Sequence, residues 1–343
     1  MQLEEISRTL LNEESSEKEL IAALDAFATL CSNISGIEAE LCYTAWSEDA
    51  HTSNGVAIDP KAAAYCVKDY RRSIAFIRGT YAALKSLAQS STRDTPIRIL
   101  YAGCGPYATI LLPLLPLFDS NQFSIQLLDI HQTSLDSVAL LLKANNLHHY
   151  DVTLVCADAC EYKAASTFDL VLLEVMQKAL EQEPQVAATQ NLVTQLAPAG
   201  YLIPKLIEVD LCLVNSDAVA SRASRHTPLG YFDYEKEAFI IKLKRLIALS
   251  LEDTLQQART NERAETSVLL LGSIKIPEID NLHLFSPALF TRIQIFEHYC
   301  LEYYDSSLSL PSPCSELEPL TVGQKFQASY SMSAYPKINW SRL

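Results

Sequence analysis

Glycines and acids at the ends of apolar segments are the residues whose types and spacing could do chemistry. Gly103 and Gly105 flank one residue directly after a short apolar segment. A strand that ends in Gly-x-Gly and leads into a helix brings backbone N–H groups close to a ligand. Asp129 ends the next apolar segment, where a carboxylate can bind ribose hydroxyls, and Asp158 ends the one after, within reach of an adenine amino group. Together these positions predict a nucleoside site, whereas the glycine pair alone could be a simple turn.

The segments that must position these residues alternate in type. Apolar segments expected to be strands begin at Ile97 and cover 123–129, 151–158 and 168–174. Helices are expected after the Gly-x-Gly motif, over 131–147, and over 184–200, where Gly200 would close the helix. Continuous apolar strands that alternate with helices are typical of parallel strands covered on both faces. The sequence therefore predicts a doubly wound α/β sheet.

Different patterns flank this core. An amphipathic helical region covers about 3–30, and a second helix is expected to start with Asp59 as N-cap and Pro60 in its first turn. After Gly200 apolar and polar residues alternate, which indicates an antiparallel β-rich domain, interrupted by a helix-period segment at 235–260. We therefore expect an N-terminal helical region at 1–93 that caps the site, a core at 94–205, and a β-rich, barrel-like domain at 206–343.

Composition excludes several classes of function. The 343 residues carry a formal net charge of −14, which disfavours a general nucleic-acid binder. The longest apolar run, 110–118, is too short to span a membrane, and the acidic first ten residues do not resemble a secretion signal. The nine cysteines form no Cys-x-x-Cys pair and the seven histidines are dispersed. We expect a cytoplasmic protein with reduced thiols and without a metal, a membrane or a nucleic-acid partner.

The third glycine of a dinucleotide-binding motif is replaced by Ala108, and Asp158 would have no evident role in binding NAD. The chain instead resembles class I S-adenosylmethionine (SAM) methyltransferases, whose core is Rossmann-like. The sequence departs from these enzymes at Tyr101, where they usually carry an acid. The resemblance implies that SAM is the cofactor, S-adenosylhomocysteine (SAH) its product, and that the cofactor contacts Gly103, Cys104, Gly105, Asp129, Ile130, Asp158 and Ala159.

Residues 65–205 further resemble the protein arginine methyltransferases. That family carries two glutamates nine residues apart after its fourth strand, with a methionine two residues after the first, as in Glu174, Met176 and Glu183. An Asp-x-x-Arg motif upstream is matched by Asp69 and Arg72. The resemblance implies that the two glutamates are catalytic and bind a guanidino substrate together with Met176, that Arg72 binds the SAM carboxylate, and that a homodimer is possible.

The acceptor pocket departs from the family pattern. Leu173 stands where a serine usually precedes the first glutamate, and Gln177 replaces a glycine. A Thr-His-Trp segment is not recognisable, since 225–230 and 335–340 contain the residue types without the pattern. Free arginine or a related small molecule is therefore as plausible an acceptor as a protein arginine.

Two carboxylates suit a guanidinium, because its planar donors can be held bidentately while one nitrogen is aimed at a methyl group. The plainer reading makes Glu183 part of a solvated acidic turn and Arg72 a surface residue. Two other functions also stay open, namely methyl or alkyl transfer from SAM to a different small molecule and a non-catalytic binding module with this fold.

Overall fold

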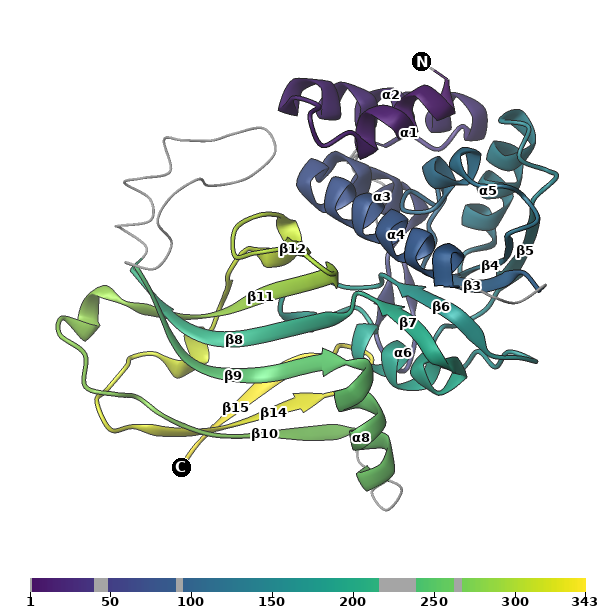
Figure 1. Cartoon of the computed structure of the whole chain (residues 1–343). Coiled ribbons are helices and arrows are strands. Elements are labelled where there is room, and N and C mark those ends of the chain that lie inside the picture. Colours follow the sequence, from purple (N-terminus) through teal and green to yellow (C-terminus); the bar gives the residue numbers. More distant parts are fainter. Residues whose placement is uncertain (1, 40–48, 91–94, 216–238, 262–266) are drawn as a thin grey trace.

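The computed structural model describes residues 2–39, 49–90, 95–215, 239–261 and 267–343. Its core is a five-stranded sheet in the order β5-β4-β3-β6-β7, and every neighbouring pair is parallel (Figure 1). The strands are β3 (Ile97–Ala102), β4 (Phe123–Asp129), β5 (Asp151–Cys156), β6 (Phe168–Leu173) and β7 (Leu196–Ile203). This order confirms the predicted doubly wound fold, whose strand order reverses between β3 and β6.

Helices cover both faces of this sheet. Side chains along β3 alternate, so Ile99 and Tyr101 pack on one face while Leu100 and Ala102 pack on the other. The first face is covered by α1 (Leu3–Leu11), α2 (Glu17–Ser35), α4 (Tyr70–Ser90) and α5 (Gln132–Ala144). The second is covered by α6 (Gln185–Leu192) and the start of α8 (Leu251–Asn261). Burial on both faces explains why these strands are apolar throughout.

Capping residues mark the ends of the N-terminal helices. Ser16 and Glu19 form a capping box at the start of α2, and Gly36 ends it with φ +76°. As predicted, Asp59 caps the short helix α3 (Pro60–Tyr65), because its side chain accepts a hydrogen bond from the Lys61 N–H. A two-stranded hairpin precedes it, formed by β1 (Ala50–His51) and β2 (Val56–Ala57). A 3₁₀ turn, Cys66–Lys68, then leads into α4.

Two helices expected in the core take other forms. The segment after Gly-x-Gly is a turn followed by a 3₁₀ helix, Leu112–Leu117, because Pro113 and Pro116 lack the N–H groups that an α-helix needs. The helix expected over 184–200 ends at Leu192 and a short 3₁₀ turn, and Gly200 lies inside β7. A Cβ on Gly200 would lie 3.0 Å from the Phe168 carbonyl oxygen, so this glycine serves strand packing instead of closing a helix.

The second half of the chain forms two antiparallel sheets that face one another (Figure 1). The first has the order β12-β11-β8-β9, from β8 (Leu206–Val214), β9 (Ile240–Ser250), β11 (Ser286–Phe296) and β12 (Tyr299–Leu301), with β13 (Ser312–Pro313) beside β11. The second comprises β10 (Val268–Lys275), β14 (Lys325–Ser331) and β15 (Lys337–Arg342). Short 3₁₀ turns lie at Leu282–Leu284, Ser307–Ser309 and Ser315–Leu317.

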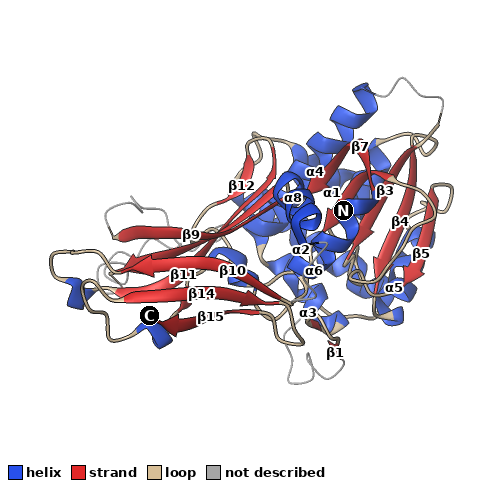
Figure 2. Cartoon of the chain, turned by 90° about the horizontal axis from the view of Figure 1, so that it is seen from below, coloured by secondary structure: helices blue, strands red, loops and turns tan. Residues whose placement is uncertain are grey.

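The helix predicted over 235–260 is wrong for Ile240–Ser250 and confirmed from Leu251 onward. Residues Ile240–Ser250 form β9 and pair with β8, the helix α8 begins at Leu251, and 235–238 lie outside the described residues. Leu246, Ile247 and Leu249 are buried in the common core, so the apolar stripe belongs to a strand whose pairing overrides its helical spacing. Figure 2 shows α8 at the junction between the two halves. The homodimer that the family resemblance implies therefore gains no support from this segment and stays a prediction.

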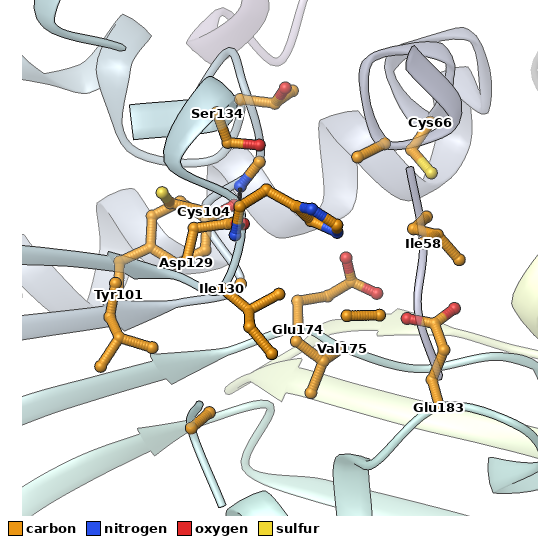
Figure 3. A pocket seen from close by; sticks show the side chains of 18 of the residues that line it. Ile58, Cys66, Tyr101, Cys104, Asp129, Ile130, Ser134, Glu174, Val175 and Glu183 are labelled. Carbon is orange, nitrogen blue, oxygen red and sulfur yellow. Dashed lines mark hydrogen bonds between the residues drawn. The ribbon is translucent and has the colours of Figure 1, made fainter. Parts of the chain in front are cut away.

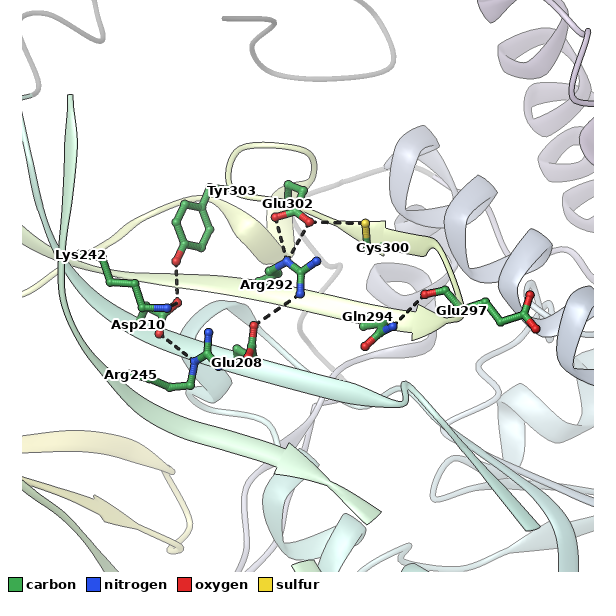
Figure 4. Close-up of polar contacts among 10 residues, drawn as sticks. All are labelled: Glu208, Asp210, Lys242, Arg245, Arg292, Gln294, Glu297, Cys300, Glu302 and Tyr303. Atoms are coloured by element: carbon green, nitrogen blue, oxygen red, sulfur yellow. Dashed lines mark hydrogen bonds and ion pairs between the residues drawn. The ribbon is translucent and has the colours of Figure 1, made fainter. Parts of the chain in front are cut away.

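A network of charged side chains lies on β8, β9, β11 and the loop after β12 (Figure 4). At its centre the Asp210 carboxylate is 1% exposed and accepts hydrogen bonds from Lys242 (2.5 Å), Arg245 (3.2 Å) and the Tyr303 hydroxyl (2.6 Å). Neighbouring ion pairs join Glu208 to Arg245 and Arg292, and Arg292 to Glu302. These hydrogen bonds and ion pairs connect β8, β9 and β11 to one another and to the loop after β12. Within the part of the chain that the structure describes, no helix is long and apolar enough to cross a membrane.

The network predicts a stability effect. Asp210→Ala should lower the free energy of unfolding by about 2 kcal/mol, because it leaves the half-buried Tyr303 hydroxyl without its acceptor and removes a buried carboxylate from two ion pairs. The loss stays at this level because the Lys242 and Arg245 side chains are 43% and 44% exposed and can turn to water. Urea unfolding followed by circular dichroism measures it, with Glu278→Ala, at an exposed acid, as the matched control. Equal urea midpoints for Asp210→Ala and Glu278→Ala would contradict a stabilising role of the Asp210 network.

Candidate functional site

A cavity opens at the carboxyl ends of β3, β4, β5 and β6, where the strand order reverses (Figure 3). Ligands bind at this place in doubly wound sheets. All of its lining residues lie between Thr52 and Pro184, so the β-rich half contributes none among the described residues. The lining combines the Gly-x-Gly loop, the residues after β4 and β5, and a cluster of charged side chains.

Asp129 holds the Gly-x-Gly loop in place. Its Oδ2 accepts the Gly105 N–H at 2.8 Å, and its Oδ1 accepts the His131 N–H at 2.9 Å. Burial raises the pKa of Asp129, although these hydrogen bonds and the charge of His131 act in the opposite direction. Gly103 adopts φ +72°, and a Cβ there would lie 2.3 Å from Val175 Cγ1, so only glycine fits. The loop backbone can therefore lie directly under a ligand.

The far side of the cavity is formed by the residues that follow β4 and β5. Ile130, Asp158 and Ala159 line it. The Asp158 Oδ1 accepts the Cys160 N–H at 2.8 Å, which fixes the side chain at the end of the turn. An apolar side chain beside a carboxylate suits a flat ring with an exocyclic amino group.

Arg72 and Glu174 form a nearly buried ion pair in the cavity wall. The Arg72 Nη2 lies 2.5 Å from the Glu174 Oε2, and the two side chains are 12% and 10% exposed. Burial by itself would lower the pKa of Arg72, but the adjacent Glu174 carboxylate raises that pKa well above its ordinary value. At the start of the same helix, Asp69 accepts hydrogen bonds from the N–H and hydroxyl of Ser307 at 2.8 and 2.6 Å. The helix that carries Arg72 is thus anchored to the β-rich half.

Glu183 is a second carboxyl group beside this pair. Figure 3 shows Glu174 and Glu183 with their carboxyl groups turned toward one another. Glu183 is 6% exposed, and burial, with a further contribution from the charge of Glu174, raises its pKa to about 8. The charge of Arg72 and a hydrogen bond with the Gln177 side chain lower the pKa of Glu183 but do not offset the burial. Among the described residues, this part of the cavity wall therefore combines two acids, Glu174 and Glu183, with the Arg72 cation.

A strained loop returns the chain from Glu174 to Glu183. Ala179, Leu180 and Gln182 adopt positive φ values of 58°, 58° and 67°, which L-residues with side chains rarely adopt. Contacts from the β-rich half hold this loop, since the Thr291 hydroxyl accepts the Ala179 N–H at 2.7 Å and the Tyr330 hydroxyl donates to the Leu180 carbonyl at 2.6 Å. The described residues of the second half thus shape the site without lining it.

The β1–β2 hairpin packs on the other side of the same loop. The Val56 N–H donates to the Gln182 carbonyl oxygen at 2.9 Å. A Cβ on Gly55 would lie 2.8 Å from the Pro184 backbone nitrogen, so the hairpin can approach this closely only because position 55 is glycine. The hairpin therefore helps to bury Glu183.

The cavity contains most of the residues singled out from the sequence. These are Arg72, Gly103, Cys104, Gly105, Asp129, Ile130, Asp158, Ala159, Glu174 and Glu183. Met176 does not line it and is packed in the core at 2% exposure. Residues 225–230 lie outside the described residues. The 335–340 segment does not line the cavity, but the Pro336 carbonyl accepts the Gln182 N–H at 2.8 Å.

Sequence reasoning missed other lining residues. Gln177 had been noted only as a departure, yet it hydrogen-bonds Glu183. His131 and Ser134 lie at the start of the helix directly after Asp129, and this position in the sequence could have indicated that they line the cavity. Cys66 and Ile58 come from the segment before α4, where nothing in the sequence indicated a cavity.

Unpartnered polar atoms gather in the cavity lining. Within the described residues, six buried side-chain nitrogen or oxygen atoms lack a hydrogen-bond partner, and three of them belong to lining residues: Glu174 Oε1, His131 Nε2 and Ser134 Oγ. Buried polar atoms are normally paired, so this concentration indicates that a polar ligand completes the site. The described residues include no group of three His, Cys, Asp or Glu side chains that could hold a metal ion.

Comparisons with known proteins give similarities of structure only. No protein-family model matches the sequence, and no curated protein does. A Trypanosoma brucei PRMT1 enzyme–prozyme complex with AdoHcy is 10% identical, with a TM-score of 0.47 over 81% of this chain and 96% of that one. Arabidopsis thaliana protein arginine methyltransferase 10 is 11% identical, with a TM-score of 0.46 over 78% and 86%. Both are arginine methyltransferases, the family whose motifs the sequence resembles.

The buried Glu183 predicts a pH-dependent stability. Because its pKa is raised from 4.5 to about 8, the folded protein keeps a proton that the unfolded chain releases. Stability should therefore fall as pH rises from about 5 to 8. Glu183→Gln should remove the contribution of this carboxyl group to the fall and raise the thermal midpoint of the ligand-free protein more at pH 8 than at pH 5. Thermal unfolding across this range tests it, with exposed Glu161→Gln as control. A uniform shift at every pH would refute the burial argument.

Proposed function

We propose that the cavity binds S-adenosyl-L-methionine and that the protein transfers its methyl group to a guanidino nitrogen held by Glu174 and Glu183. The observation that carries the proposal is the arrangement of a buried and a nearly buried carboxyl group beside one nearly buried cation, at the end of the sheet where the Gly-x-Gly loop lies. A guanidinium would supply the missing positive charge. The acceptor is a small guanidino compound such as free arginine, or a protein arginine.

The residues that would hold the cofactor follow from their positions in the cavity. Bound SAM would supply a methyl group on a positively charged sulfur. Asp129 would accept hydrogen bonds from its ribose, and Asp158, with Ile130 and Ala159, would contact its adenine. Arg72 would bind its carboxylate, and the pairing with Glu174 already orients the guanidinium for that role. The Gly-x-Gly loop would lie alongside the remaining, amino-acid part, where Gly103 and Gly105 would allow its close approach to the backbone.

The two glutamates would orient the acceptor. Glu174 Oε1 lacks a partner and can accept one N–H of a guanidinium, while ionised Glu183 accepts others. Binding this cation favours the charged form of Glu183, so its proton leaves to solvent as the substrate enters. With both carboxylates drawing the positive charge toward their side, the lone pair of the remaining nitrogen faces the methyl group. That nitrogen gains the methyl and finally loses one proton.

A methyl-transfer assay tests the proposal. Isotope-labelled SAM is incubated with free arginine, other guanidino compounds and arginine-rich peptides, and products are read by mass spectrometry. We expect one class to gain methyl groups, and Glu183→Gln to reduce turnover by at least about 100-fold while SAH affinity stays within about twofold. Glu181→Gln is the matched control, because Glu181 lies on the same loop but hydrogen-bonds Ser312 outside the cavity.

The other outcomes of this assay separate the alternatives. SAH binding without methylation of any guanidine would overturn the acceptor assignment and favour a different small molecule. Absence of SAH binding would overturn the whole proposal in favour of a non-catalytic module.

The pKa of Glu183 also predicts the pH dependence of the reaction. Only the ionised carboxylate binds the guanidinium well, so kcat/KM at saturating SAM should rise as pH increases from 6 toward 8. The midpoint should lie at or below about 8, because the positive sulfur of SAM favours the charged carboxylate. Steady-state kinetics in a constant-ionic-strength buffer series measures this profile. A flat profile between pH 6 and 8 would contradict the role of Glu183.

A further inference from the structure

Two unpartnered side chains stand at the N-terminus of α5, next to Asp129. His131 is the N-cap residue of this 13-residue helix and makes no side-chain capping bond. Among the residues that the structure describes, its buried Nε2 has no hydrogen-bond partner, and neither has the hydroxyl of Ser134, a residue 1% exposed. Both residues line the cavity, and Figure 3 shows Ser134 in its wall. Nothing in the fold explains why these two polar atoms are buried without partners.

The next serine on the same helix face shows how a structural serine behaves here. Ser137, one turn further along α5, is also buried, but its hydroxyl donates to the Pro106 carbonyl oxygen at 2.5 Å. Ser134 makes no such bond, although its burial costs the hydroxyl its contact with water. This contrast indicates that the partner of Ser134 is a ligand in the cavity.

The chemistry around these atoms selects the kind of ligand group. A phosphate or carboxylate would be repelled by the adjacent Asp129 carboxylate, which is itself nearly buried. A hydroxyl group suits the place, because it donates one hydrogen bond and accepts others. Asp129 can accept from such hydroxyls but cannot donate to them when ionised, and its two oxygens already receive the Gly105 and His131 N–H groups. Ser134 and the imidazole of His131 can supply the donors that buried hydroxyl oxygens need.

We infer that His131 and Ser134, together with Asp129, form a clamp for the two ribose hydroxyls of the nucleoside, with Asp129 accepting and the other two donating. This inference rests on the proposed function for the identity of the nucleoside. It assigns His131 and Ser134 as specificity-determining residues, through which the protein distinguishes a ribose from a deoxyribose.

Calorimetric titration tests the clamp. The full chain and its Ser134→Ala and His131→Ala variants are titrated with SAH and with its 2′-deoxy and 3′-deoxy analogues. Each variant should bind SAH about tenfold more weakly than the wild type. For the deoxy analogue that lacks the hydroxyl bound by the substituted residue, the affinity of the variant should lie within about twofold of the wild-type affinity. The wild type cannot make that hydrogen bond to this analogue either. Thr133→Ala, an exposed residue in the same helical turn, is the matched control.

Ligand-free stability gives a second readout. Ser134→Ala removes a buried hydroxyl without a partner, so its thermal midpoint without ligand should equal or exceed that of the wild type. Weaker SAH binding in a protein that is no less stable separates a binding role from a structural one.

Several outcomes would overturn the clamp. These are SAH affinities equal to that of Thr133→Ala, equal losses for SAH and both analogues, or competition by inorganic phosphate that Ser134→Ala abolishes. Failure of the wild type to bind SAH would instead remove the proposed function and the clamp with it, so the two failures are distinguishable.

Discussion

The arrangement of this site depends on one electrostatic imbalance: two buried carboxyl groups share a single buried cation. The Arg72 guanidinium pairs with Glu174, and Glu183 is left with a side-chain amide and the charge of its neighbours. An ionised pair of glutamates without a second cation is unfavourable in a nearly dry wall, which is why Glu183 retains its proton to about pH 8. A ligand with its own delocalised positive charge relieves this imbalance. The ligand-free site therefore lacks one positive charge, which a bound guanidinium would supply.

The surrounding elements maintain that imbalance from several directions. Asp129 fixes the Gly-x-Gly loop, while Gly103 lets it lie against the chain next to Glu174. The loop to Glu183 is held in a strained conformation by hydrogen bonds from β11 and β14, and the β1–β2 hairpin closes over it. These contacts come from regions far apart in the sequence. Their cost in strain and in unpaired polar atoms is typical of residues that are kept for binding and not for stability.

The sequence predicted what depends on local pattern. Apolar strands ending in glycine or aspartate revealed the parallel sheet and the cavity edge, because the carboxyl ends of parallel strands meet at one edge. It could not predict what depends on distant contacts. Ile240–Ser250 has helical spacing but becomes β9 through pairing with β8, and Gly200 lies inside β7, where a Cβ would approach the Phe168 carbonyl oxygen of the neighbouring strand. The family motif placed Met176 at the acceptor, whereas the fold buries it, and only the three-dimensional structure shows that Ser134 and His131 have no partners.

The charge state of Glu183 can be measured by carbon-13 NMR of the full-length protein labelled at the glutamate side-chain carboxyl carbons. We expect one carboxyl resonance that titrates near pH 8, disappears in Glu183→Gln, and moves to a lower pKa when a guanidino compound such as free arginine is added with SAH. Every glutamate resonance titrating in its ordinary range, near pH 4 to 5, would contradict it. In that case the two carboxylates would need no further cation, and the basis for a guanidinium substrate would be lost.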